Sequence, residues 1–355
     1  QRIHVTSIVN AYDDGKSTGA IRRFFGMLGP SDIRKVQELM LPKDGPDHEN
    51  YVTLFQYRFP LDCNREDVLE QLKLFLDSES MELVGIHLNN IRVREKLKSF
   101  LAEFLAGLNT IEKARQEPFD FADCSIMNCL YAGAFLASNR NIEQATVSID
   151  RLFQLCGTVL PTSIEDKQLV AQRENGEILY SEAEIVELRS NVRVERIYLL
   201  DQSLDKSMFE ILDHNEKRSY LERHHCYVGV SPGVRRALQQ ADIIIYAAGT
   251  QHSSLYPTYM SVGLAQSISD NHSALKIFIT NIGADYETPR YKASDYILGA
   301  HRYLNLSDER NYSMEELFDV IFINQSHFKD DETYVEYDEG GFHDISIQRL
   351  IDVFE

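Results

Sequence analysis

The apolar residues of the chain gather in short runs that alternate with segments of helical spacing. The apolar runs cover residues 3–9, 242–248 and 275–281, while residues 234–240 and 259–269 have the spacing of helices. Apolar strands that lack polar alternation and are separated by helices are typical of a parallel sheet covered on both faces. The pattern therefore predicts an α/β fold with a Rossmann-like, doubly wound and mainly parallel sheet.

A different pattern separates the first strand from the later ones. Residues 65–76 and 93–115 carry Leu, Phe and Ile at helical spacing among many charged residues, which predicts two amphipathic helices. We therefore divide the chain into a Rossmann-like domain of residues 1–59 and 120–355 and an added helical segment of residues 60–119. This helical segment is either an ordinary packed layer or a mobile lid over a ligand.

Composition narrows the class of protein. The 355 residues have a formal net charge of −19, which disfavours a nucleic-acid partner because such binding relies on cationic side chains. The apolar runs are shorter than the roughly 20 residues that cross a bilayer, so we expect no membrane partner. Five cysteines without a C-x-x-C pair favour a reducing compartment, and hence a cytoplasmic location.

Two features of the chain's ends complete this picture. Gln1, rather than a methionine, opens the chain, so we expect an upstream segment to be missing. The acidic stretch at residues 329–338 does not have the spacing of an EF-hand loop and is more typical of a solvated face.

The first predicted strand is followed by a turn with two acidic residues. Asp13 and Asp14 fall at the edge where parallel sheets bind ligands, and their carboxylates could hold Mg²⁺ between protein and phosphate. The same residues also fit a simple turn with a helix cap. Ser17, Thr18 and Gly19 follow at a helix start, where hydroxyl and backbone N–H groups can bind a phosphate.

Two further polar segments lie beside predicted elements. In residues 30–34, Asp32 can cap a helix or bind a metal, and Arg34 can bind a phosphate or lie on the surface. Residues 249–254 follow the most apolar strand and therefore face the same crevice. His252 in this loop is either a general acid or base or a structural histidine. The loop supplies these candidate phosphate contacts: Gly249, Thr250, Ser253 and Ser254.

The chain has none of the common catalytic signatures G-x-G-x-x-G, Walker A or G-x-S-x-G. His224, His225 and Cys226 are consecutive, and consecutive residues of a strand point to opposite faces, which argues against a zinc site. The residues therefore indicate phosphate binding more clearly than any particular reaction.

Taken in order, these segments resemble motifs of the CofD-like superfamily. The likeness is stronger to its gluconeogenesis-factor (YvcK) branch than to its 2-phospho-L-lactate transferase (CofD) branch. It covers nearly the whole chain, although the family's opening G-G-T-G turn is missing and Met127 stands where the family has glycine. The matching segments are residues 11–19 (AYDDGKSTG), 29–34 (GPSDIR), 54–59 (LFQYRF), 125–128 (SIMN), 159–162 (VLPT), 247–257 (AAGTQHSSLYP), 287–288 (ET), 295 (D) and 343–344 (HD).

The resemblance implies a nucleotide or nucleotide-sugar ligand. On the first branch, the chain would bind a UDP-sugar type of diphosphate and act as a regulator of carbon and cell-envelope metabolism without turnover. On the second branch, it would be a Mg²⁺-dependent transferase acting on a nucleoside-diphosphate-linked donor. Asp13, Asp14 and Asp32 would then be catalytic, with Asp13 and Asp14 holding the metal. On either branch Asn128 and Asp32 would line the pocket. Arg34 would position the phosphates, and the superfamily resemblance is consistent with a homodimer.

Overall fold

The computed structural model describes residues 3–77, 79–323 and 335. The chain divides into two compact units, residues 1–166 (unit 1) and residues 167–355 (unit 2), and each is described by itself. The HD pair at residues 343–344 lies outside the described residues, as does the acidic stretch at 329–338 apart from Val335. Within the described part, no helix is both long and apolar enough to cross a membrane.

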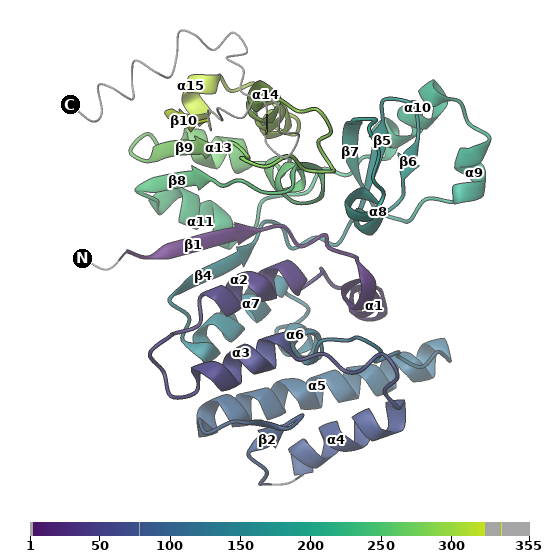
Figure 1. Cartoon of the computed structure of the whole chain (residues 1–355), viewed down its shortest axis with the longest axis vertical. Coiled ribbons are helices and arrows are strands. Elements are labelled where there is room, and N and C mark those ends of the chain that lie inside the picture. Colours follow the sequence, from purple (N-terminus) through teal and green to yellow (C-terminus); the bar gives the residue numbers. More distant parts are fainter. Residues whose placement is uncertain (1–2, 78, 324–334, 336–355) are drawn as a thin grey trace. The chain divides into compact units, whose positions relative to one another are not determined.

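Unit 1 combines helices with a pair of parallel strands (Figure 1). Strand β1 runs parallel to β4, with Val5 opposite Gly157 and Val9 opposite Pro161. The predicted first strand is confirmed, although it begins two residues later than expected. The elements in chain order are β1 (Val5–Val9), α1 (Lys16–Phe25), α2 (Ser31–Leu39), α3 (His48–Gln56), α4 (Arg65–Asp77), β2 (Glu82–Leu83), β3 (Ile86–His87), α5 (Ile91–Arg115), α6 (Ile126–Ala137), α7 (Ile142–Phe153) and β4, which spans Gly157–Pro161.

Helix α6 lies at the centre of the packing in unit 1. Its sequence is apolar on all sides, and residues 126–135 are all buried, as expected for a helix surrounded by other elements. Gly133 allows α5 to come close, because a Cβ at this position would lie only 1.8 Å from the carbonyl oxygen of Phe100. The start of α6 is therefore held on a well-packed scaffold.

The two helices predicted in residues 60–119 are present as α4 and α5, and both belong to unit 1. Helix α5 packs against α4 and α6 (Figure 1). One side of α5 is buried, including Val93, Leu97 and Phe104, which agrees with its amphipathic pattern. Whether this segment also acts as a lid stays a prediction.

Unit 2 contains one parallel and one antiparallel sheet. Strands β8 and β10 both run parallel to β9, which lies between them. Strands β6 and β7 run antiparallel to β5, around a small core that includes Val170, Tyr198 and Phe209. The elements in chain order are β5 (Gln168–Arg173), β6 (Ile178–Leu179), α8 (Glu182–Glu187), β7 (Val194–Leu200), α9 (Lys206–Glu210), α10 (His214–His224), α11 (Pro232–Gln240), β8 (Ile243–Tyr246), η1 (Gln251–Leu255), α12 (Tyr256–Tyr259), α13 (Leu264–Ser269), β9 (Leu275–Ile279), α14 (Ala293–Leu304), α15 (Met314–Leu317) and β10 (Val320–Phe322).

The helices and parallel strands of the two units confirm the predicted α/β fold. Two local predictions were wrong. Most of the expected loop of residues 249–254 belongs to the π-helix η1, and the helix expected over residues 259–269 is interrupted. Gly263 adopts a φ of 82° immediately before α13, a left-handed conformation that ends one helical segment and allows the next to begin.

Candidate functional site

The turn between β1 and α1 is held in place by two glycines. A Cβ on Gly19 would lie 2.0 Å from the carbonyl oxygen of Asp14, and a Cβ on Gly29 would lie 2.2 Å from that of Asp13. The N–H of Gly29 also donates to the carbonyl of Ala11 at 2.8 Å. Only glycine permits such close approach of backbone segments, so these residues fix the path of the acidic turn.

The side chain of Asp13 has a structural role in this turn, because its Oδ1 accepts a hydrogen bond from the Gly15 N–H at 3.0 Å. Burial raises the pKa of Asp13, and the neighbouring charges of Asp32 and Asp14 raise it further. Asp32 forms an ion pair with Lys35 at 2.9 Å. The three predicted acidic residues, Asp13, Asp14 and Asp32, are therefore close enough for the charges of Asp14 and Asp32 to act on Asp13.

The starts of α1 and α2 are joined through their side chains. The hydroxyl of Thr18, in the first turn of α1, hydrogen bonds to the hydroxyl of Ser31, the first residue of α2. Ser17 accepts a hydrogen bond from Arg58 Nη1 at 3.1 Å. Because Ser17, Thr18 and Ser31 are all buried, these helix starts form one polar cluster.

Arg58 links this cluster to the start of α6. Its Nη1 also donates to the carbonyl of Asp123 at 2.8 Å, and its backbone forms an isolated antiparallel bridge with Ser125, the N-cap residue of α6. Arg58 was not among the predicted site residues. Its place in the LFQYRF segment, which resembles a family motif, could have marked Arg58 as a site residue. The neighbouring sequence did not show that Arg58 contacts Ser17, which lies 41 positions away.

Asn128 lies in the first turn of α6 and is fully buried. Among the described residues, neither its Nδ2 nor its Oδ1 has a hydrogen-bond partner, and the same holds for the hydroxyl of Ser125. Buried polar side-chain atoms are nearly always paired in native proteins. Ser125 and Asn128 therefore place buried polar atoms at the start of α6 that no described group of the chain pairs.

Arg34 is buried rather than exposed on the surface, which rules out the simplest alternative considered for it. Its Nη1 donates to the carbonyl of Phe55, and Nε has no partner in the part of the chain that the structure describes. Burial lowers the pKa of Arg34, and the positive charge of Arg58 lowers it further. Two arginines thus share the region of the helix starts.

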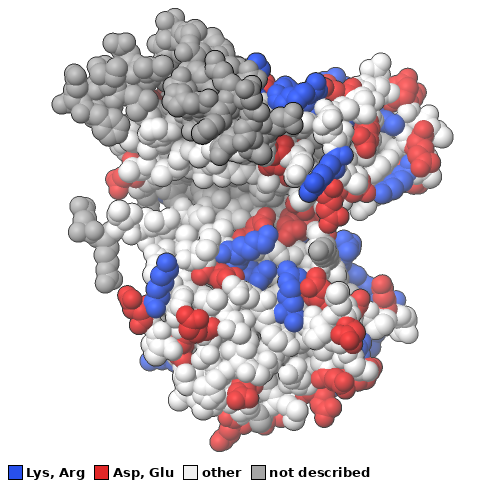
Figure 2. Space-filling model, in the orientation of Figure 1, with Lys and Arg blue, Asp and Glu red and all other residues white. Residues whose placement is uncertain are grey.

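None of the helices α1, α2 and α6 has a side-chain cap at its N-terminus in the described structure. Such ends present N–H groups and a partial positive charge that favour an anion. Lysine and arginine side chains gather on the face of unit 1 over α1 and α2, with acidic side chains beside them (Figure 2).

The predicted loop of residues 249–254 belongs to unit 2 and has a different character. The carboxylate of Glu287 accepts hydrogen bonds from the backbone N–H groups of His252 and Ser253 at 2.9 and 3.0 Å, and from Ser253 Oγ at 2.5 Å. Burial raises the pKa of Glu287 to about 7, although the hydrogen bonds from Ser253 act in the opposite direction. A carboxylate of the chain itself therefore occupies donors that we predicted for a phosphate.

The rest of this loop is also tied internally. Gly249 donates from its N–H to Asn281 Oδ1 at 3.2 Å, and its carbonyl accepts from Asn281 Nδ2 at 2.9 Å. Thr250 Oγ1 lies within hydrogen-bond distance of both Ser253 Oγ and Ser254 Oγ, at 2.9 Å from each. A phosphate role for these residues stays a prediction.

His252 is buried, and this burial lowers its pKa to about 3. A histidine with such a pKa is neutral at pH 7 and is a poor proton donor, which favours the structural interpretation. Across the described residues, no group of three or more His, Cys, Asp or Glu side chains is arranged to hold a metal.

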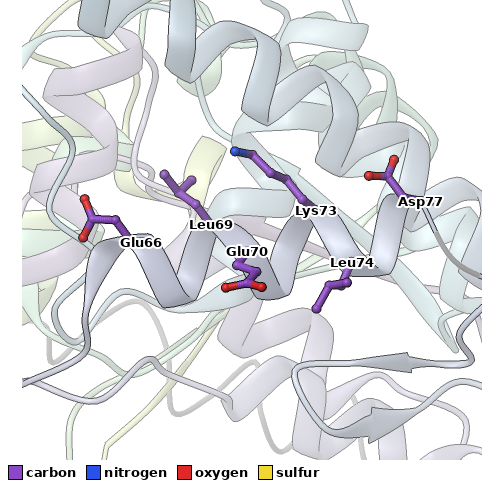
Figure 3. Close-up of a pocket in the computed structure, with 6 residues that line it drawn as sticks. All are labelled: Glu66, Leu69, Glu70, Lys73, Leu74 and Asp77. Atoms are coloured by element: carbon purple, nitrogen blue, oxygen red, sulfur yellow. The ribbon is translucent and has the colours of Figure 1, made fainter.

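A cavity of about 310 Å³ lies elsewhere in unit 1 and involves none of the predicted site residues. The side chains that line it all come from α4 (Figure 3). They are Glu66, Leu69, Glu70, Lys73, Leu74 and Asp77.

Comparison with known protein families shows to which family the chain belongs. The family profile described as 2-phospho-L-lactate transferase CofD matches residues 1–351. The chain belongs to the CofD family. Its uncapped helix starts and its unpaired Asn128 are thus features of a CofD-family protein.

Curated relatives of this CofD-family chain carry a different name. It is 23% identical to the gluconeogenesis factor of Listeria monocytogenes over 359 residues, which cover 99% of this chain and 81% of that protein. It is 25% identical to a putative gluconeogenesis factor of Thermotoga maritima over 304 residues, or 85% of this chain and 68% of that one. The predicted resemblance to this branch is confirmed.

Solved structures support the same fold. Two crystal structures of a Bacillus halodurans protein, one described as a UPF0052 family member, superpose on the CofD-family chain with TM-scores of 0.59 and 0.61. The sequence identities are 17% and 18%, and the matches cover 95% and 99% of this chain and 80% and 82% of the other. At these identities the likeness concerns the fold alone.

Proposed function

We propose that unit 1 of this CofD-family protein binds a nucleotide or nucleotide sugar where α1, α2 and α6 begin. The observation that carries the proposal is the buried amide of Asn128, whose Nδ2 and Oδ1 both lack a partner among the described residues. An unpaired buried polar group costs about 1–3 kcal/mol, so its presence in a folded core favours a ligand that completes the pairing.

The donor and acceptor atoms of the Asn128 amide restrict the kinds of ligand that could pair with it. Its Nδ2 needs an acceptor and its Oδ1 needs a donor. A phosphate ester supplies acceptors, and the hydroxyl groups of ribose or of a second sugar supply donors as well. A nucleoside diphosphate linked to a sugar therefore supplies both the acceptor and the donor that Asn128 needs.

The helix starts and arginines suit the diphosphate part of such a ligand. Uncapped N-termini bind phosphate oxygens through backbone N–H groups, and Arg58, whose side chain is partly exposed, offers a planar guanidinium for charge-assisted hydrogen bonds. Arg34 adds positive charge from below the surface.

The names of the relatives favour a regulator over an enzyme. Proteins from Listeria monocytogenes and Thermotoga maritima that match most of the chain are called gluconeogenesis factors. We therefore propose that the chain binds a UDP-sugar type of ligand without turnover and acts in the control of carbon or cell-envelope metabolism. The free thiols of all five cysteines support a reducing, cytoplasmic location.

The family description favours a second candidate, a Mg²⁺-dependent transferase. Asp13 and Asp14 would hold the cation, and Asp32 would add negative charge close by. Two carboxylates are a fitting set for Mg²⁺ when phosphate oxygens and water complete its shell. When bound, the cation would stabilise charge on the diphosphate, while Arg58 and the helix starts would orient it.

A ligand screen tests the proposal and separates the two candidates. The thermal midpoint of the chain is measured with UDP-glucose, GDP and pyrophosphate, with and without Mg²⁺, since a ligand that binds the native state raises its stability. We expect UDP-glucose to raise the midpoint more than pyrophosphate. Recovery of intact UDP-glucose supports a regulator, release of a mononucleotide supports a transferase, and the lack of any shift contradicts both.

The metal contribution is tested with Asp14→Asn, which keeps the size of the side chain and removes its charge. We expect this variant to lose any Mg²⁺-dependent part of the shift, because its amide is a weaker ligand for a hard cation. Asp44→Asn, at an exposed position of the same unit, is the control. An unaltered Mg²⁺ response in Asp14→Asn would contradict the metal role.

A further inference from the structure

Two buried cysteines lie on either side of the start of α6. Cys124 and Cys129 are both fully buried, and their Sγ atoms are 3.8 Å apart. Cys124 directly precedes the N-cap Ser125, and Cys129 is the fourth residue of the helix. These are the positions at which two apolar side chains commonly pack to fix the entry of a chain into a helix.

The segment held by this pair contains the candidate ligand-binding groups. Ser125 and Asn128 lie between the two cysteines in the sequence, and both have buried unpaired polar atoms. The carbonyl of Cys124 also accepts a hydrogen bond from the Phe59 N–H at 3.0 Å, next to Arg58. A displacement of Cys124 would therefore also move Arg58, Ser125 and Asn128, the three residues that we propose contact the ligand.

We propose that Cys124 and Cys129 are a redox switch that forms a disulfide under peroxide and thereby weakens ligand binding at the start of α6. The effect on binding rests on the proposed function, whereas disulfide formation does not. The reduced pair packs the helix entry, and the oxidised pair distorts it.

The reaction balances with hydrogen peroxide as the oxidant. One thiolate attacks a peroxide oxygen, the O–O bond breaks, and a sulfenic acid and one water form. The second thiolate then attacks the sulfenic sulfur, an S–S bond forms, and the hydroxyl group leaves as a second water after protonation. Two thiols are oxidised and one peroxide is reduced to two waters.

The geometry gives the direction of the effect. The sulfur atoms of a disulfide are about 2.0 Å apart, so those of Cys124 and Cys129 must approach by about 1.8 Å from their present 3.8 Å. Both residues lie in a packed interior, so we expect this approach to displace the backbone at Ser125 and Asn128. Because binding sites lose affinity when their groups move by about 0.5–1 Å, we expect weaker binding.

The burial of the two thiols also affects how they can be oxidised. Burial raises the pKa of Cys129 well above its usual value, and buried thiols are inert while they stay covered. Oxidation therefore proceeds through openings of the first turn of α6. If oxidation lowers the affinity of a ligand at Ser125 and Asn128, that ligand must shift the thiol–disulfide equilibrium toward the thiols by the same factor.

The experiment uses the full chain, reduced or treated with hydrogen peroxide. Mass spectrometry of the peptide that spans residues 124–129 reports the loss of two hydrogens, and titration calorimetry with UDP-glucose reports affinity. We expect the disulfide to form and the affinity to fall by about tenfold or more, with recovery on reduction. Cys129→Ala and Cys124→Ala should each remove the peroxide effect, whereas Cys156→Ala, at an exposed position of unit 1, should retain it.

The outcomes separate this proposal from the proposed function. A reduced chain that does not bind UDP-glucose contradicts the proposed function. The switch is then judged by the mass change and by faster amide exchange at Asn128 in the oxidised chain, because distortion of this turn weakens the hydrogen bond from the Asn128 N–H to the Ser125 carbonyl. Failure of the disulfide to form, or a disulfide that leaves both affinity and amide exchange unaltered, would overturn the switch.

Discussion

The start of α6 in unit 1 and the loop of residues 249–254 in unit 2 both lie in segments that match family motifs, but they differ in how their polar groups are paired. At α6, the buried side chains of Ser125 and Asn128 have atoms without a partner among the described residues. In the loop, Glu287 accepts three hydrogen bonds from His252 and Ser253. One region has buried polar groups without a partner among the described residues, and the other pairs its polar groups with a carboxylate from the chain itself.

This difference teaches that small polar residues after a strand do not by themselves define a phosphate site. Their amide and hydroxyl groups can bind a phosphate only when the fold leaves these groups unpaired. A single acidic residue from elsewhere in the chain can accept their hydrogen bonds instead. The predictions below test whether Glu287 and Asn128 differ in this way.

The largest effect is expected for Glu287→Ala. This change removes the carboxylate that accepts hydrogen bonds from the backbone N–H groups of His252 and Ser253. We expect the free energy of unfolding to fall by about 4 kcal/mol. Urea denaturation at pH 6 measures it. Glu309→Ala, at an exposed position of unit 2, is the control, and a fall no larger than that of the control would show that the loop does not depend on Glu287.

The pH dependence of stability sharpens the same point. The pKa of Glu287 is raised to about 7 in the folded chain, so its contribution is fully present below about pH 4.5 and is lost as pH rises through 7. Relative to Glu287→Gln, which does not titrate, we expect the wild type to lose on the order of 3 kcal/mol across this range. Denaturation of both proteins from pH 4.5 to 8 measures the difference, and a difference independent of pH would refute the assignment.

The unit 1 region is tested by Arg58→Ala. Arg58 contacts Ser17 at the start of α1 and is partly exposed, so we expect little change in stability but a loss of about tenfold in affinity for UDP-glucose. Titration calorimetry measures the affinity. Arg151→Ala, at an exposed position of the same unit, is the matched control, and equal affinities for the two variants would remove Arg58 from the site.

The sequence predicted the parts of the fold that depend on local patterns. The amphipathic spacing of α4 and α5 and the apolar runs of β1, β8 and β9 were sufficient to place these elements. The antiparallel sheet of unit 2 was missed, and one of its strands, β6, has only two residues, too few to show alternation.

The candidate site was predictable only in part, for a related reason. Asp13, Ser17 and Thr18 follow a strand directly and were found from this pattern. Asn128 was found only through the family resemblance, because nothing in its neighbourhood indicates an unpaired amide. Arg58 and Glu287 were missed as partners of Ser17 and Ser253, which lie 41 and 34 positions away in the sequence, since such contacts arise from tertiary packing.

The most direct test of the account is the unfolding free energy of Asn128→Ala, measured by urea denaturation with and without UDP-glucose. Because the amide of Asn128 is buried and unpaired, we predict that its removal leaves the stability of the free protein unchanged or raises it by up to about 1 kcal/mol, while stabilisation by UDP-glucose disappears. Asn109→Ala, at an exposed position of α5, should keep that stabilisation. A marked loss of stability in free Asn128→Ala, with UDP-glucose still stabilising it, would contradict the claim that this side chain is kept for a ligand.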